Sequence, residues 1–148
     1  MKWIEVRSRE WATKYRSDKP WAAISIATEP DTWPILDGHN RVDLLQMAFY
    51  DICNPETLLR GFFEGQVFDQ EQALQVLEFV SQCWRKVDSF LIHCEAGISR
   101  SPAIAAAIAH IYYGSGADNW YFQNRTPNML VYREILHTHY DPKGIMGR

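Results

Sequence analysis

The chain has 148 residues, of which 47% are apolar and 22% charged, and its formal net charge at pH 7 is −3. This length and composition are typical of one globular domain with a buried core, so we expect a single domain over residues 1–148. The negative charge argues against general nucleic-acid binding, and the absence of an apolar run of about eighteen residues argues against a membrane span.

The N-terminal residues and the cysteines indicate the compartment. Glu5 and Glu10 lie in the first ten residues, which contain no apolar core segment and therefore do not resemble a signal peptide. Three cysteines (Cys53, Cys83 and Cys94) are too few for a disulfide framework, and a reactive thiol needs a reducing compartment. We expect a cytoplasmic protein.

The first half of the chain is predicted to contain three strands and one short helix. The strands are expected at 3–6, 21–27 and 42–49, and the helix is expected to be capped by Ser8 and to run to Tyr15. Residues 29–40, with two prolines and one glycine, are predicted to be loop. The long stretch 50–67 is also predicted to be irregular, and loops of this length are often functional.

The second half alternates between helices and one central strand. Helices are expected at 69–87, 101–113, 117–123 and 128–139, and the strand at 89–93. Asp69 and Gln72 form a plausible capping box at the start of the first of these helices. Because strands alternate with helices, the sequence predicts an α/β fold with a central, mainly parallel sheet flanked by helices.

The loop between the strand at 89–93 and the helix at 101–113 carries the chemistry. It reads His93-Cys94-Glu95-Ala96-Gly97-Ile98-Ser99-Arg100-Ser101-Pro102. Its backbone amides at a helix start are expected to form an anion-binding nest, in which Gly97 permits a tight curl. Arg100 offers a planar fork that can grip two phosphate oxygens.

Three side chains of this loop have predicted roles in catalysis. Cys94 is the expected nucleophile, because free amides and the helix terminus stabilise a thiolate. Ser101 is placed to donate a hydrogen bond to the sulfur, and Arg100 to hold the phosphoryl oxygens. His93 is expected to orient the loop rather than to transfer protons.

His93-Cys94, five residues and then Arg100-Ser101 resemble the signature of the cysteine-based protein tyrosine phosphatase superfamily, and residues 95–102 most resemble its compact dual-specificity branch. The resemblance extends over about residues 20–140. It implies a phosphotyrosine-phosphatase-like fold, a phosphocysteine intermediate and no metal or other cofactor. It also implies a phosphorylated protein or small phosphomonoester as substrate, and inhibition by oxyanions such as phosphate, sulfate and vanadate. The phosphate is expected to bind to His93, Glu95, Ala96, Gly97, Ile98 and Ser99.

The resemblance also implies a general acid on the loop after the preceding sheet strand. Asp51 fits this context, because it follows the strand predicted at 42–49, although it lies 43 residues before Cys94 and an insertion must be assumed. Glu64, 30 residues before Cys94, competes on spacing, and Asp69 is the third candidate although it is also a good helix cap. The alternative for Asp51 is a carboxylate that bonds nearby turn amides.

Two further residues are open to two interpretations. The segment 125–128 resembles the one that precedes the last helix of dual-specificity phosphatases, in which an asparagine braces the reactive loop. Asn128 is, however, equally suited to cap that helix. Cys53 is expected to be an inert buried thiol, with a protective disulfide to Cys94 as the alternative.

The predicted function is a phosphomonoester hydrolase that acts on phosphotyrosine and also on phosphoserine or phosphothreonine. The reactive loop has no lysine and one acid, Glu95, which argues against a highly charged phosphoinositide or an RNA 5′-triphosphate. A phosphate-binding module with little turnover is the first alternative. A sulfurtransferase of the rhodanese type or an arsenate reductase is the second, and His93 and Ser101-Pro102 disfavour it.

Overall fold

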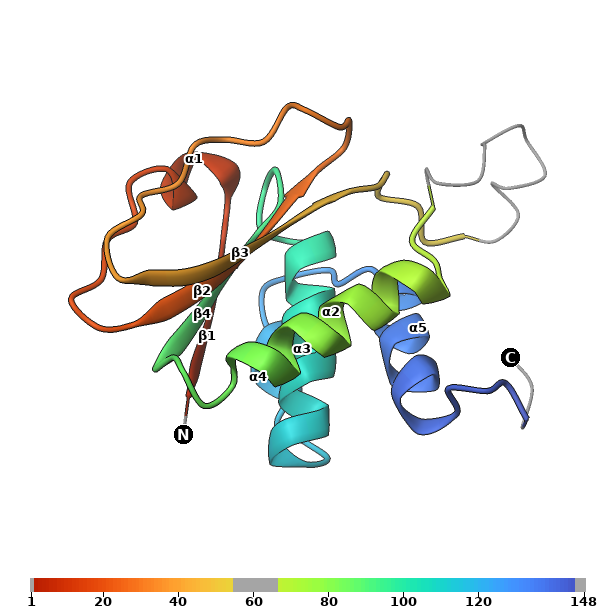
Figure 1. Cartoon of the computed structure of the whole chain (residues 1–148). Coiled ribbons are helices and arrows are strands. Elements are labelled where there is room, and N and C mark those ends of the chain that lie inside the picture. Colours follow the sequence, from red (N-terminus) through yellow and green to blue (C-terminus); the bar gives the residue numbers. More distant parts are fainter. Residues whose placement is uncertain (1, 55–66, 146–148) are drawn as a thin grey trace.

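The computed structural model describes residues 2–54 and 67–145 of the chain (Figure 1). Its described strands form one four-stranded sheet in the order β1-β4-β2-β3, and every pair of neighbours is parallel. The strands are β1 Trp3–Arg7, β2 Trp21–Ala27, β3 Arg41–Ala48 and β4 Ser89–His93. The predicted α/β fold with a parallel sheet is confirmed.

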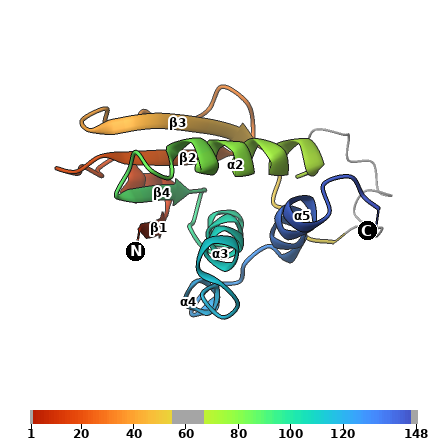
Figure 2. The ribbon, with the colours of Figure 1, turned by 60° about the horizontal axis from the view of Figure 1, so that its bottom comes forward.

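Five described helices accompany the sheet. They are α1 Arg9–Ala12, α2 Gln70–Cys83, α3 Arg100–Tyr113, α4 Asn119–Phe122 and α5 Met129–Tyr140. The larger core unites one face of the sheet with α2, α3 and α5, whereas a small cluster that includes Ala12 of α1 covers the other face. Figure 2 shows the strands stacked in the order β3, β2, β4 and β1, with α3 and α5 beside them. None of the described helices is both long and apolar enough to cross a membrane.

The burial of the strands follows from their place in the sheet. All seven residues of β2 are buried, because this strand has a neighbour on each edge and is covered on both faces. The edge strand β3 keeps most of its side chains at least partly exposed. The uninterrupted apolar sequence of β2 is therefore the pattern of a central parallel strand.

Two predicted helix ends differ from the structure by three residues or more. The helix α1 ends at Ala12 rather than Tyr15, because the amides of Lys14 and Tyr15 bond three residues back in tight single turns. The helix α2 ends at Cys83 rather than Val87, because the amide of Lys86 bonds the carbonyl of Cys83, three residues back, in a turn. Beside this turn, Trp84 stacks on Tyr112 with ring centroids 3.9 Å apart.

The predicted capping box of α2 is formed only in part. Asp69 Oδ1 accepts a hydrogen bond from the backbone amide of Gln72 at 2.9 Å, as the sequence indicated. The side chain of Gln72 does not return to Asp69 but donates to the carbonyl of Ala48 at 3.1 Å. It therefore joins α2 to the end of β3 instead of closing the box.

The parallel order of the strands brings several loops to one edge of the sheet. The carboxyl ends of β2, β3 and β4 are adjacent in the order of the sheet, so the segments that follow Ala27, Ala48 and His93 leave it side by side. Open α/β sheets bind ligands at this edge. The cysteine-containing loop leaves β4 there and enters α3 at Arg100.

Candidate active site

The sulfur of Cys94 lies at the floor of the loop that joins β4 to α3. The Cys94 side chain is buried, and its Sγ accepts a hydrogen bond from the amide of Gly97 at 3.3 Å. The hydroxyl of Ser101 lies 3.1 Å from the same sulfur. Both groups can donate a hydrogen bond to this sulfur.

His93 fixes the backbone on which Cys94 stands. Its Nδ1 lies 3.0 Å from the carbonyl oxygen of Cys94, which can only accept, so Nδ1 carries the proton. Its Nε2 therefore accepts from the hydroxyl of Ser25 on β2 at 2.6 Å. Burial lowers the pKa of His93, which keeps the ring neutral and suits a structural group better than a proton donor.

Gly97 lets the loop press against the connection between β1 and α1. Its φ is +77°, and a Cβ atom built on it would lie 2.7 Å from the carbonyl carbon of Arg7. Beside it, the amide of Arg9 donates to the carbonyl of Glu95 at 3.0 Å, and the Arg9 guanidinium lies 3.7 Å from the Glu95 carboxylate. The N-terminal segment thus supports the loop from behind.

The guanidinium of Arg100 is held by the ends of two strands. Its Nη1 donates to the carbonyl of Phe49 at 2.8 Å and to the hydroxyl of Thr28 at 3.0 Å. Those two bonds use the two protons of Nη1, which leaves Nε and Nη2 as a pair of donors on one edge of the guanidinium. Such a pair matches two oxygens of a phosphate.

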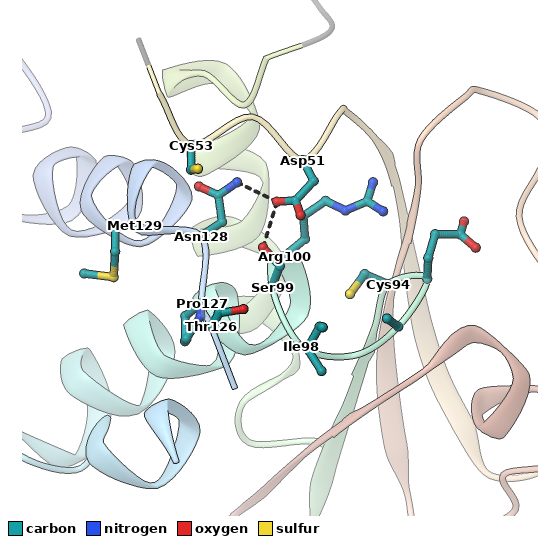
Figure 3. Close-up of a pocket in the computed structure, with 12 residues that line it drawn as sticks. Asp51, Cys53, Cys94, Ile98, Ser99, Arg100, Thr126, Pro127, Asn128 and Met129 are labelled. Atoms are coloured by element: carbon teal, nitrogen blue, oxygen red, sulfur yellow. Dashed lines mark hydrogen bonds between the residues drawn. The ribbon is translucent and has the colours of Figure 1, made fainter. Parts of the chain in front are cut away.

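Asp51 is attached to the loop by two side chains. Ser99 Oγ and Asn128 Nδ2 each donate to Asp51 Oδ1 at 2.8 Å (Figure 3). Ser99 is the N-cap residue of α3, but its hydroxyl makes no capping bond to its own helix. The first amides of α3 are consequently left for an anion, while Ser99 holds the carboxylate.

The Asn128 side chain caps α5, one of the two roles that the sequence left open, and it also contacts the segment that carries Asp51. Its Oδ1 accepts from the amide of Val131 at 3.1 Å and caps α5. Its Nδ2 donates to Asp51 and to the carbonyl of Ile52 at 3.1 Å. The same amide therefore starts the last helix and holds the segment that carries Asp51.

These groups surround one open cavity of about 630 Å³. It is lined by Asp51, Cys53, Cys94, Glu95, Ala96, Ile98, Ser99, Arg100, Thr126, Pro127, Asn128 and Met129. Among these described residues, Arg100 carries the only positive charge. A single small anion such as a phosphoryl group fits this distribution of charge.

Of the other two candidates for the acid, the structure describes only one. Asp69 caps α2 and does not line it, and Glu64 lies outside the described residues. The expectation that Cys53 is buried is wrong, because its side chain is exposed at the rim of the cavity. The thiols of Cys53, Cys83 and Cys94 are all free.

Known proteins resemble this chain in structure and not in sequence. No protein-family model matches the chain, and neither does any curated protein. A solved structure of a mutant form of Tk-PTP is 16% identical with a TM-score of 0.59, over 93% of this chain and 92% of its own. PTPMT1 in complex with PI(5)P is 10% identical with a TM-score of 0.55, and the match covers 94% of this chain and 91% of PTPMT1. A human tyrosine phosphatase-like serine/threonine/tyrosine-interacting protein is 20% identical with a TM-score of 0.51. The match covers 82% of this chain and 77% of the human protein.

The chain has the fold of the dual-specificity phosphatases. At these identities the comparisons concern the fold, so the roles of individual residues rest on the geometry described above.

Within this phosphatase fold, the sequence did not reveal three contacts of the site. They are the hydroxyls of Ser25 and Thr28 and the backbone of Arg7. Thr28 had one usable signal, because it directly follows the strand 21–27, whose carboxyl end meets the reactive loop. Ser25 had none, since a serine inside an apolar strand does not identify its partner in the next strand.

The described part of the phosphatase fold offers no cluster of metal ligands. Within residues 2–54 and 67–145, no group of three or more histidine, cysteine, aspartate or glutamate side chains could hold a metal ion. His110, near the opposite end of α3 from Arg100, lies 3.2 Å from Asp118.

Proposed function

We propose that this protein is a cysteine-dependent phosphomonoesterase that hydrolyses phosphotyrosine and phosphoserine or phosphothreonine esters. The observation that carries the proposal is the joint placement of three groups on one cavity. Cys94 offers a nucleophile, Arg100 a two-pronged cation and Asp51 a carboxylate. A phosphomonoester needs these three functions, namely attack on phosphorus, charge stabilisation and protonation of the leaving oxygen.

The first step forms a phosphocysteine. The Cys94 thiolate attacks phosphorus, the bond from phosphorus to the ester oxygen breaks, and that oxygen takes a proton from Asp51. Nε and Nη2 of Arg100 hold two of the phosphoryl oxygens, while the amides at the start of α3 face the charge that develops. Since Oδ1 of Asp51 already accepts two hydrogen bonds, the proton is carried by Oδ2.

The second step releases phosphate. A water molecule attacks phosphorus and gives a proton to the Asp51 carboxylate, which is thereby returned to its acid form. The bond between sulfur and phosphorus breaks, and Cys94 leaves as a thiolate. The Ser101 hydroxyl, 3.1 Å from the sulfur, donates to the charge that returns to it.

The lining and charge of the cavity support an aryl or alkyl phosphate as the substrate. Ile98, Pro127 and Met129 give part of its lining an apolar character (Figure 3). The structural neighbour PTPMT1 was solved with PI(5)P. A phosphoinositide headgroup needs several cations, whereas the described lining offers only Arg100, so we favour a phosphorylated side chain.

A phosphate-binding module with little turnover is the second candidate, and one comparison favours it. The human neighbour is named as a phosphatase-like interacting protein rather than as a phosphatase. The presence of Cys94 and Asp51 on the same cavity supports turnover instead. A reducing compartment such as the cytoplasm would keep Cys94 reduced, which is the location we propose.

The test compares Cys94→Ser with Cys53→Ser. Both thiols line the cavity, but only Cys94 contacts Ser101 and the amide of Gly97. Hydrolysis of p-nitrophenyl phosphate should disappear in Cys94→Ser and persist in Cys53→Ser, while both variants retain the urea midpoint of the wild type. Vanadate binding without turnover by the wild type would favour the binding module, and sulfur transfer from thiosulfate would favour a rhodanese-like enzyme.

A further inference from the structure

A row of shallow depressions leads from the cavity at Cys94 to the free edge of β1. The first two, of about 310 and 260 Å³, lie beyond Ile98, and a third, of about 250 Å³, lies along β1. We call this row the lateral groove and define it by Trp3, Ile98, Trp120, Asn124 and Arg125.

Shared lining residues show that the lateral groove is continuous with the cavity. Ile98 and Thr126 line both the cavity and the first depression. Ile98, Asn124 and Arg125 are common to the first and second depressions, and Trp120 and Arg125 to the second and third. A ligand that leaves the cavity over Ile98 therefore enters the lateral groove directly.

Large apolar side chains are exposed along this path. Ile98 is 49% exposed, Trp120 is 52% exposed and Trp3 is 50% exposed. The rings of Trp3 and Trp120 come from β1 and α4 and lie against each other with centroids 6.2 Å apart. Clustered, half-exposed aromatic residues are typical of surfaces that bind protein chains, where tryptophan often contributes most of the affinity.

The lateral groove also contains a cationic side chain, Arg125, that has no carboxylate partner among the described residues. Arg125 Nη1 donates to the carbonyl of Trp120 at 3.3 Å, and among the described residues it forms no ion pair. Arg7, which lines the third depression, is by contrast paired with Glu5 at 2.5 Å. Arg125 is therefore available to an acidic group of a ligand.

The segment that bears Arg125 is attached to the reactive loop. The amide of Thr126 donates to the carbonyl of Ile98 at 2.9 Å, and the amide of Asn128 donates to the carbonyl of Ser99 at 3.0 Å. These two bonds align the segment alongside the loop, and Asn128 then reaches Asp51. The lateral groove is thus built on the same backbone as the catalytic groups and is held in a fixed position relative to them.

We propose that the lateral groove binds the polypeptide that flanks the phosphorylated residue of a protein substrate. An apolar or aromatic side chain of this peptide packs on Trp3 and Trp120, and an acidic side chain pairs with Arg125. The inference rests on the proposed function and adds to it a surface that recognises the residues beside the phosphorylated one. A phospholipid is disfavoured, because a binding site for its charged headgroup needs several cationic side chains. The described part of the groove offers one cation that is not paired, Arg125.

The experiment compares substrates that do and do not reach the groove. The wild type and Trp120→Ala are assayed on p-nitrophenyl phosphate, on an isolated phosphotyrosine amide, and on phosphotyrosine peptides extended toward either terminus with leucine, tryptophan and aspartate. Trp11→Ala, which removes an exposed tryptophan on α1, is the matched control. One of the two extensions should raise kcat/KM roughly tenfold in the wild type and in Trp11→Ala, and Trp120→Ala should lose that gain. Turnover of p-nitrophenyl phosphate should not change.

A charge reversal tests the same surface without relying on the stability of α4. Arg125→Glu should lose the preference for aspartate in the extended peptide and gain a preference for lysine at the same position. Such an exchange is a rescue that a merely misfolded variant cannot show.

The possible outcomes separate this inference from the proposed function. If neither extension raises kcat/KM, or if Trp120→Ala lowers turnover of every substrate equally, the groove does not bind the substrate peptide. A larger loss in Trp120→Ala on a soluble phosphoinositide than on the peptide would overturn the choice of a protein. If the wild type hydrolyses nothing, the proposed function fails, and the inference is then decided by binding of the extended peptide to Cys94→Ser, measured by fluorescence anisotropy with Trp120→Ala in the same background.

Discussion

Asn128 Nδ2 donates a hydrogen bond of 2.8 Å to Asp51 Oδ1, although the two residues are 77 positions apart in the chain. This bond joins the start of α5 to the segment after β3 and holds a carboxylate over the loop of Cys94. Ser99 donates to the same oxygen from the loop itself. The position of Asp51 is therefore determined by two donors from different parts of the fold.

Asp51→Asn should lower kcat by roughly 10² to 10⁴, the usual contribution of a positioned proton donor. The loss should be large for alkyl phosphates and phosphotyrosine, whose leaving oxygens are basic, and small for a very acidic phenol. A series of aryl phosphates measures this dependence. Asp69→Asn keeps a side-chain oxygen that can cap α2, so it should change stability little and should show no leaving-group dependence. If Glu64→Gln shows that dependence and Asp51→Asn does not, Asp51 is not the acid.

Asn128→Ser should separate the two roles of Asn128. Serine also caps helices, so α5 should remain stable to within about 1 kcal/mol, whereas the hydrogen bond to Asp51 is lost. We expect kcat for phosphotyrosine to fall roughly tenfold to a hundredfold, the contribution of a hydrogen bond to a charged group. In the Asp51→Asn background the same change should cost much less, because the two residues act as one unit. Equal losses of kcat in both backgrounds would mean that Asn128 does not act through its hydrogen bond to Asp51.

Arg100→Lys should impair catalysis and vanadate binding although the charge is kept. The single ammonium of lysine cannot bond Phe49 and Thr28 and also present two donors to a phosphate. Vanadate inhibition constants measure the loss directly, and Arg133→Lys, on the exposed face of α5, is the control. Normal inhibition of Arg100→Lys would mean that Arg100 is only a background cation.

Gly97→Ala should destabilise the protein and abolish turnover. Gly97 combines a φ of +77° with a place for Cβ only 2.7 Å from the carbonyl carbon of Arg7. Gly116→Ala is a matched control, because Gly116 has a φ of +94° and nothing within 4 Å of its Cβ position. The control should lose about 1 to 2 kcal/mol from backbone strain alone and keep its activity. Urea unfolding and p-nitrophenyl phosphate turnover measure both effects, and equal losses of stability would refute the contact with Arg7.

His93 should make the folded state less stable in mild acid. Burial lowers its pKa below the value of about 6.5 that it has in the unfolded chain, so between these two values the unfolded state binds more protons. The free energy of unfolding should therefore have its full value above about pH 6.5. It should decrease as the pH falls from there toward the lower pKa of His93 in the folded state. Urea unfolding between pH 5 and 7.5 measures the slope. His93→Gln should flatten the slope even if it lowers overall stability.

The fold class and the reactive loop could both be predicted from the amino-acid sequence. The strand 21–27 is a run of seven apolar or small residues, which only a central strand covered on both faces can bury, and its predicted bounds agree with β2. The loop 93–102 could be interpreted because a strand, a glycine and a helix start are contiguous in the chain, so local geometry alone brings the thiol and the guanidinium together.

The groups that complete the site could be identified only from the packing of the folded chain. Asp51, Ser99 and Asn128 meet because the carboxyl ends of parallel strands share one edge of the sheet and α5 begins beside it, a relationship that residue spacing does not contain. The exposure of Cys53 and the partnership of Thr28 with Arg100 depend on the same packing. Contacts between distant segments result from burial of the whole core, and for this reason the loop was readable from the sequence whereas its surroundings were not.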